Sequence, residues 1–240
     1  MSTPTSNTIG SREFIYARKG TGIAWLAGYP RSGAARVRTI LAHCFGMVTG
    51  SIYNETNIGA GYSQILNCCP EPWPVPEVEA CVQRQKWLFY KTHEVPAPNE
   101  SVPTIVIVRD GRRTLESLRA FYADRNNIVY TVEKLVEDQH KWGSWSDWIK
   151  AWAVGAPPDT LWLRYEDLMA DVPTAVDRIA RRFDLTPIAH EVPPFEELHK
   201  LEPQIFRKCE VEGNGGMTEA EEETFWKRHG SAMTLLGYHR

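Results

Sequence analysis

Four short runs of consecutive apolar residues constrain the fold of this chain most. Almost every position within a run is apolar, so a strand built from it is buried on both faces, as in a parallel sheet. Between the runs, apolar residues recur every three or four positions, which is typical of helices. The alternation predicts an α/β fold with a central, mainly parallel sheet flanked by helices, with strands at 22–28, 87–90, 104–108 and 160–163.

The helical segments are expected at 112–123, 144–153 and 173–184, with one more directly after the first strand. A last helix begins at the capping-box pattern Thr218–Glu221 and ends near Gly237. The stretch 51–76 has no sustained period and is expected to be a long irregular loop. Tryptophans recur at helical spacing at Trp142, Trp145, Trp148 and Trp152. Such a spacing is typical of core packing.

Composition describes an ordinary folded domain. The chain has 240 residues, of which 42% are hydrophobic and 24% charged. We expect a flexible segment at 1–20 and a single domain at 21–240. The net charge of −3 argues against generic nucleic-acid binding, and no apolar stretch approaches the roughly 20 residues that span a bilayer. An odd number of cysteines, five, without C-x-x-C spacing and without an export signal predicts a cytoplasmic protein.

The first strand runs into a glycine-bounded loop, Gly28 to Gly33, followed by a helical pattern. Such a loop can turn its backbone amides towards a phosphate, and the helix N-terminus adds partial positive charge. A nucleoside triphosphatase would continue with Lys and Ser or Thr, whereas this chain has Ala34 and Ala35. Its cation lies inside the loop, at Arg31, where a guanidinium can hold an anion with two hydrogen bonds. An ordinary turn with a solvated arginine remains the alternative at this point.

Two further strand ends carry polar residues that suit an anion site. Lys91 and His93 follow the run 87–90, and the carboxyl ends of parallel strands are where open α/β sheets bind ligands. Histidine can accept a proton from an attacking hydroxyl near neutral pH. Arg109 ends the next strand, and Ser117 follows eight residues later in a helix, so the pair could hold a second anion.

Taken together, these segments resemble the sulfotransferases that use 3′-phosphoadenosine 5′-phosphosulfate (PAPS). The loop 29–33 (Tyr-Pro-Arg-Ser-Gly) resembles the sulfate-donor loop, and 91–93 (Lys-Thr-His) resembles the catalytic-base segment. Arg109 and Ser117 stand at the family's spacing for the 3′-phosphate. Two later segments, 163–168 and 206–208, also match, and the resemblance runs in order from about 22 to 238.

The resemblance implies a three-layer, P-loop-type fold and a role for each matching residue. The implied activity moves a sulfuryl group from PAPS to a hydroxyl or amine of a small-molecule acceptor, without a metal, and releases adenosine 3′,5′-bisphosphate (PAP). The implied catalytic residues are His93 as general base, with Arg31 and Lys91 as cations. The implied donor-binding residues are Arg31, Ser32, Gly33, Ala34, Ala35, Arg36, Arg109, Ser117, Arg207 and Lys208. No nucleic-acid or membrane partner is implied, and we expect the loop 51–76, with Tyr53, Tyr62 and Trp73, to contact the acceptor.

The chain also departs from the family pattern. Ala34, Ala35 and Arg36 replace the usual Thr-Thr-Trp, which removes hydroxyl contacts and an aromatic that stacks on adenine; Arg36 could stack instead. Cys209 stands where the family has glycine after Arg-Lys. Two alternatives therefore stay open, a P-loop kinase or nucleotide hydrolase and a degenerate nucleotide-binding protein. Glu166 is interpreted as a structural residue that follows the last strand.

Overall fold

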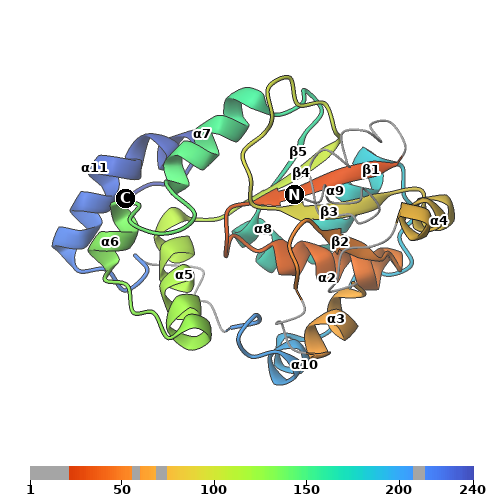
Figure 1. The fold of residues 1–240 in the computed structure, drawn as a ribbon, viewed down its shortest axis with the longest axis horizontal. Helices are drawn as coiled ribbons and strands as arrows, with labels where there is room; N and C mark the ends of the chain where they lie inside the picture. Colours follow the sequence, from red (N-terminus) through yellow and green to blue (C-terminus); the bar gives the residue numbers. More distant parts are fainter. Residues whose placement is uncertain (1–21, 56–59, 69–74, 208–213) are drawn as a thin grey trace, which may run out of the picture.

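The computed structural model describes residues 22–55, 60–68, 75–207 and 214–240. The expected flexible segment at 1–20 lies outside the described residues, as do Trp73, Lys208 and Cys209. Within the described part, the expected central sheet with flanking helices is present (Figure 1).

The sheet has five strands in the order β2-β3-β1-β4-β5, and all neighbouring pairs are parallel. The chain leaves central β1 for one side of the sheet and crosses to the other side after β3. The strand order therefore reverses at β1, and open sheets bind ligands at such a point. The strands are β1 (Ile23–Gly28), β2 (Thr49–Ser51), β3 (Leu88–Thr92), β4 (Thr104–Val108) and β5 (Leu161–Arg164).

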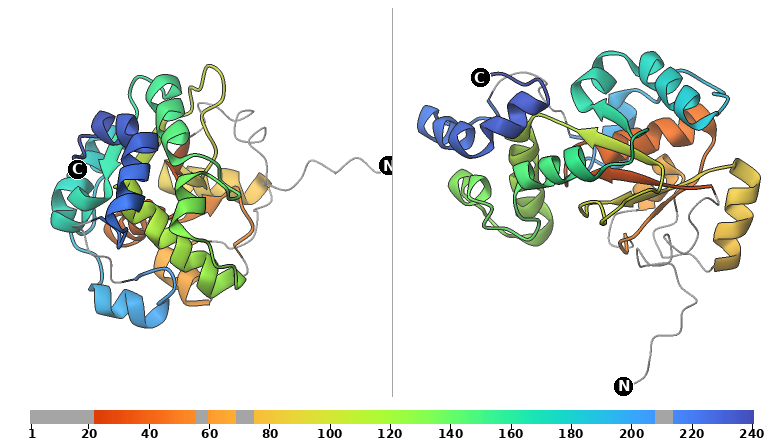
Figure 2. Two further views of the ribbon diagram at one scale, coloured as in Figure 1. Left: turned by 90° about the vertical axis from the view of Figure 1, so that its left-hand side faces the viewer. Right: turned by 90° about the horizontal axis from the view of Figure 1, so that it is seen from above.

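Helices cover both faces of this sheet and extend beyond one of its ends (Figures 1 and 2). Those before β4 are α2 (Ala34–Phe45), α3 (Ala60–Leu66) and α4 (Val75–Gln85). Those after it are α5 (Gly111–Asn126), α6 (Val132–Val136), α7 (Trp145–Gly155), α8 (Tyr165–Ala170), α9 (Val172–Phe183), α10 (Phe195–Leu201) and α11 (Glu219–Leu235).

The alternation of side chains along β1 explains the three layers. Ala24 and Leu26 point into a buried cluster with α2, α8 and α9. Trp25 points to the other face, where it packs with residues of α4 and β3. Ala27 joins a third cluster that α5, α7 and α11 cover. Because apolar side chains leave β1 in both directions, the strand is completely buried, as its continuous apolar run predicts.

Three sequence expectations about local structure need correction. The stretch 51–76 is not wholly irregular, because it contains α3, whose Ile65 and Leu66 pack against Leu198 near the end of the chain. That partner is far away in the sequence, so a local pattern does not reveal it. Strand β3 continues to Thr92, so Lys91 lies within the strand. The short edge strand β2 was also missed.

The tryptophan spacing is a core pattern, as expected. Trp145 and Trp152 are completely buried, and Trp148 is nearly so. Trp142, before the start of α7, is partly buried and packs against the same hydrophobic cluster. It has a second role that the spacing did not predict, because it also lines a cavity beside His93.

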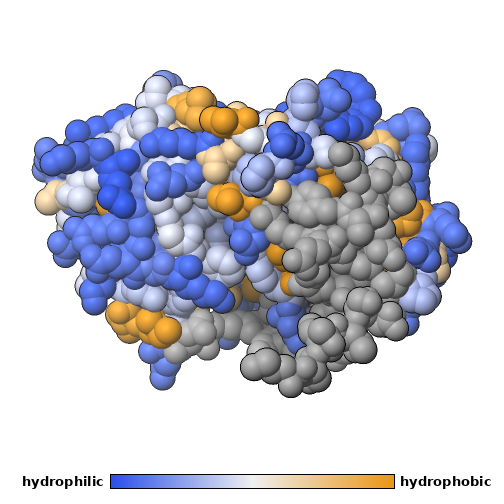
Figure 3. Space-filling view, turned by 45° about the horizontal axis from the view of Figure 1, so that its top comes forward, coloured by the Kyte–Doolittle hydropathy of each residue, from blue (hydrophilic) through white to orange (hydrophobic). Residues whose placement is uncertain are grey.

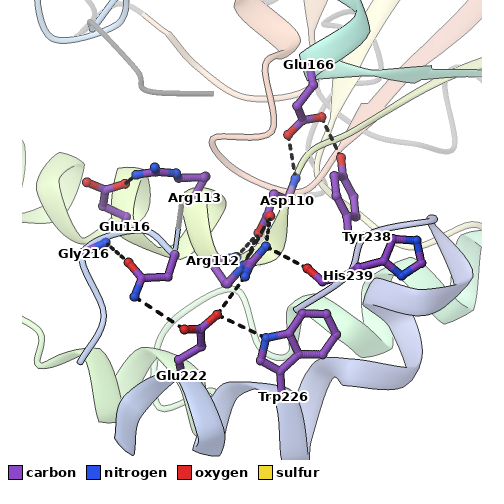
Figure 4. Close-up of polar contacts among 11 residues, drawn as sticks. Asp110, Arg112, Arg113, Glu116, Glu166, Gly216, Glu222, Trp226, Tyr238 and His239 are labelled. Atoms are coloured by element: carbon purple, nitrogen blue, oxygen red, sulfur yellow. Dashed lines mark hydrogen bonds and ion pairs between the residues drawn. The ribbon is translucent and has the colours of Figure 1, made fainter. Parts of the chain in front are cut away.

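A polar network ties the C-terminal residues to the start of α5 (Figure 4). Glu166 accepts hydrogen bonds from the Asp110 backbone N–H at 3.0 Å and from the Tyr238 hydroxyl at 2.7 Å. Arg112 bonds the Asp110 carboxylate at 2.7 Å and Glu222 at 2.8 Å. Glu166 thus has the structural role expected of it, and the network fixes the chain directly after Arg109.

Replacing Tyr238 with phenylalanine tests this network. The variant retains a ring for the Arg164 guanidinium, which lies 4.3 Å from the ring centroid, but removes the hydrogen bond to Glu166. A hydrogen bond to a charged group contributes about 1.5–3 kcal/mol, so we expect the free energy of unfolding in urea to fall by that amount. An unchanged free energy of unfolding would show that the network does not stabilise the fold.

The surface seen in Figure 3 is mostly hydrophilic, with small and separate hydrophobic patches. Among the described residues, no helix is both long and apolar enough to cross a membrane. Cys44 and Cys81 are buried free thiols.

Candidate active site

The carboxyl ends of β1, β3 and β4 lie side by side, because these three strands are parallel neighbours in the sheet. Each end carries one of the polar segments singled out in the sequence. Arg31 follows β1, His93 follows β3 and Arg109 follows β4. The fold therefore places residues distant in the sequence at the point where the strand order reverses.

A cavity of about 280 Å³ opens at this edge. Nearly all of the described residues that the sequence assigned to the site line it. These are Arg31, Gly33, Ala34, Ala35, Arg36, Lys91, His93, Arg109, Ser117 and Arg207. Ser32 does not line it, since this residue is buried and its N–H donates to the Tyr29 carbonyl in a turn at 3.0 Å.

The loop between β1 and α2 has the backbone expected of an anion-binding turn. Arg31 has a positive φ of 71°, and Gly33 has one of 109°. A Cβ at Gly33 would collide with the ring of Tyr165, so both the φ and the space require glycine there. Gly33 caps α2 without a side-chain hydrogen bond, and the first two residues of the helix, Ala34 and Ala35, line the cavity.

The Arg31 side chain connects this loop to two other segments. Its Nε donates to Ser117 Oγ at 3.1 Å, and Nη2 donates to the Ile205 carbonyl at 3.3 Å. The guanidinium also lies 5.1 Å from the ring centroid of Phe121. These contacts hold a flat cation at the cavity wall.

Arg109 lies beside Arg31 and Ser117, as the sequence predicted for a paired anion site. It is 4% exposed, and its Nη1 donates to the Arg31 carbonyl at 3.4 Å. Its guanidinium lies 4.6 Å from the ring centroid of Tyr165. Two cations and a hydroxyl from separate segments thus share one wall of the cavity.

His93 is held in one tautomer by its surroundings. Its Nδ1 lies 2.5 Å from the Gly28 carbonyl, which can only accept, so Nδ1 carries the proton. The other ring nitrogen, Nε2, makes no hydrogen bond within the described part of the chain. Burial, and secondly the nearby charge of Lys91, lower the pKa of His93 to about 3. The imidazole is therefore neutral near pH 7, and Nε2 is ready to accept a proton.

Two aromatic rings fix the orientation of His93. Tyr53 stacks on it with centroids 5.3 Å apart, and the Tyr53 hydroxyl accepts from the His93 backbone N–H at 2.9 Å. Trp142 meets the imidazole edge-on at 5.2 Å. Trp148 Nε1 donates to the His93 carbonyl at 2.8 Å. A ring restrained on several sides loses little freedom when it acts as a base.

Glu55 bridges Lys91 to a second buried cation. Its two oxygens lie 2.7 Å from Lys91 Nζ and 2.7 Å from Arg38 Nη1. Burial raises the pKa of Glu55, but the attraction of Lys91 and Arg38 outweighs it and lowers that pKa to about 2. Burial, followed by the charge of Glu55 acting in the opposite sense, leaves the pKa of Lys91 below its usual value. The carboxylate therefore holds the Lys91 ammonium at the cavity wall.

The substitution Glu55→Gln should lower stability in a pH-dependent way. The folded-state pKa of about 2 lies below the ordinary 4.5, so the carboxylate contributes stability above pH 4.5 that is lost as the pH falls towards 2. That shift corresponds to about 3 kcal/mol near neutral pH. The free energy of unfolding in urea should be lower than that of the wild type by this amount at pH 7 and by less at pH 3.

The exposed Glu223, replaced by glutamine, is the matched control and should change little. An equal loss of unfolding free energy at both pH values would contradict the claim that the ionised Glu55 carboxylate stabilises the fold.

Arg36 and Arg207 differ in how they are held. Nε of Arg36 is buried and has no hydrogen-bond partner among the described residues. Arg207 forms an ion pair with Asp124 and also donates to the Ala120 carbonyl at 3.4 Å. The two remaining residues of the expected nucleotide loop, Lys208 and Cys209, lie outside the described residues.

Sequence reasoning missed Glu55, Phe121 and Trp142 as cavity residues. Glu55 falls in the stretch expected to be irregular, although its acidic side chain was a signal in a segment with only one other charged residue, Glu71. Trp142 was assigned to the core because its spacing continues that of α7. Among the described residues, no group of three or more His, Cys, Asp or Glu could hold a metal ion.

Comparisons with known proteins agree with this fold. A family model described as "Sulfotransferase domain" matches residues 23–204. A crystal structure of mouse sulfotransferase SULT7A1 complexed with PAP superposes with a TM-score of 0.60 at 16% sequence identity, covering 96% of this chain and 95% of that chain. A search of the curated proteins gives no match. Because the family model spans most of the sequence, including the loop 28–33, β3 and β4, the chain belongs to the sulfotransferase family and is a sulfuryl-transfer enzyme.

Proposed function

We propose that this enzyme transfers the sulfuryl group of PAPS to a hydroxyl or amine of a small-molecule acceptor, without a metal and with His93 as general base. The observation that carries the proposal is the placement of His93. Its free Nε2 lies in the same cavity as the cations Arg31, Lys91 and Arg109. PAP bound to the mouse sulfotransferase supports the choice of donor.

The described residues fit an anionic nucleotide. The amides at the start of α2, together with Arg31 and Lys91, would hold the phosphosulfate end of the donor. Arg109 and Ser117 would hold its 3′-phosphate, with Arg207 and Lys208 closing over it. The unpartnered Nε of Arg36 suits a bound polar group or a stacked base.

The reaction needs a base beside the acceptor and cations beside the leaving nucleotide. His93 Nε2 takes the proton of the acceptor hydroxyl while the hydroxyl oxygen attacks the sulfur of PAPS. The bond from sulfur to the bridging oxygen breaks, and the electron pair stays on the departing PAP. Arg31 and Lys91 stabilise the charge that develops there, in fixed positions and away from bulk water.

Nucleotide calorimetry tests the donor part of this proposal. PAP should bind at least tenfold more tightly than adenosine 5′-phosphate, because a charge-assisted contact to the extra phosphate is worth about 1.5–3 kcal/mol. The difference in affinity between the two nucleotides should be smaller in Arg109→Ala. Equal affinities for the two nucleotides would refute a 3′-phosphate site at Arg109 and Ser117.

A further inference from the structure

The side of the cavity next to His93 is walled by aromatic rings. Tyr53 and Trp142 come from segments far apart in the sequence, and their ring centroids lie 5.9 Å apart at an interplanar angle of 84°. Both rings also contact the His93 imidazole, at 5.3 and 5.2 Å. An acceptor whose hydroxyl reaches His93 Nε2 must therefore lie against aromatic surface, which favours a flat molecule.

Two cations stand on this aromatic side, and one of them, Lys91, lies 5.8 Å from the centroid of the Tyr53 ring. Lys141 also lines the cavity, and its ammonium lies 4.8 Å from the centroid of the Trp142 ring. Within the described ranges no carboxylate forms an ion pair with it, whereas Lys91 is paired with Glu55 and Arg207 with Asp124. Lys141 is thus available to pair with an anion that enters along Trp142.

Lys141 is the one lining cation that is not among the residues proposed to bind the donor. Among the described lining residues are six Lys or Arg side chains and a single carboxylate, Glu55. The other five cations, Arg31, Arg36, Lys91, Arg109 and Arg207, are the ones proposed above to hold the donor. Lys141 is outside that set. Its ammonium lies over the Trp142 ring, which in turn contacts His93.

We propose that Lys141 and Trp142 form an acceptor subsite that selects a flat hydroxyl compound bearing one anionic group. The inference rests on the proposed function, because it takes His93 as the base that the acceptor hydroxyl approaches. The ring of the acceptor packs against Trp142, and its carboxylate, sulfate or phosphate pairs with the Lys141 ammonium.

A matched pair of acceptors tests the subsite. The probes are para-hydroxyphenylpropionate and its primary amide, which differ in charge but hardly in shape. We expect wild-type kcat/KM to favour the acid by about tenfold, the value of one charge-assisted contact. The ratio should approach one in Lys141→Gln and invert in Lys141→Glu. Lys150→Gln, at an exposed position of α7, is the control and should keep the wild-type ratio.

Binding separates this inference from the proposed reaction. The same two probes are titrated by calorimetry into the PAP-loaded full chain, where no turnover is needed. A preference for the acid that Lys141→Gln removes supports the subsite, even if no sulfated product ever forms. Equal binding of acid and amide to the wild type, or an acid preference that survives in Lys141→Gln, overturns it.

Discussion

His93→Ala should lower the rate of sulfuryl transfer by about 10²–10⁴-fold and leave donor affinity nearly intact. The imidazole is neutral because burial and Lys91 lower its pKa to about 3. Nδ1 bonds the Gly28 carbonyl, and Nε2 has no hydrogen-bond partner among the described residues. In the proposed reaction His93 faces the acceptor rather than the nucleotide. Steady-state kinetics with saturating donor, together with PAP calorimetry, measure the two quantities separately.

The pH dependence gives this prediction a second readout. A base with a lowered pKa stays unprotonated until the pH falls towards about 3, so the wild-type rate should show no acid limb from His93 between pH 5 and 8. His190→Ala, at an exposed histidine outside the cavity, is the matched control and should retain wild-type turnover. Turnover of His93→Ala within tenfold of the wild type would show that another group is the base.

Arg31→Ala should weaken both donor binding and turnover, with a loss of about 10²–10³-fold in the rate of transfer. The guanidinium contacts Ser117 and the Ile205 carbonyl in the cavity wall, so its charge serves the bound donor and the transition state alike. Alanine retains a Cβ, so the positive φ at this position adds no new strain. The loss therefore reports the missing charge.

Arg31→Lys separates charge from shape. Lysine restores the charge but not the planar group that bonds Ser117 and the Ile205 carbonyl at once, so it should recover donor affinity only in part. PAP affinity measured by calorimetry in the two variants distinguishes the contribution of the charge from that of the planar group. An unchanged affinity in Arg31→Ala would contradict the role of the loop in donor binding.

The sheet could be predicted from the sequence because its signal is local. Runs such as 105–108 are apolar at every position, and burial on both faces needs no partner to be specified. Helix α11 was equally clear, since Thr218 and Glu221 form the capping box that their spacing predicts. Helix α3 was missed because its apolar side chains find their partners on α10, more than a hundred residues away.

The same distinction applies to the candidate site. Arg31, His93 and Arg109 could be predicted because each follows a strand closely, and the carboxyl ends of parallel strands meet at one edge of the sheet. The tautomer of His93 could not be predicted from the sequence, because it depends on the Gly28 carbonyl of the neighbouring strand. Nor could the role of Glu55, whose partners Lys91 and Arg38 come from a strand and a helix that only the fold brings together.

The central claim is that this chain moves a sulfuryl group from PAPS to an acceptor by means of His93 and without a metal. The direct measurement incubates the protein with PAPS labelled at sulfur, a panel of hydroxyl and amine acceptors and excess EDTA, and quantifies PAP and labelled product. We predict equal amounts of PAP and sulfated acceptor, unaffected by the chelator. Transfer that EDTA stops, or PAPS binding with no sulfated product from any acceptor, would contradict the account.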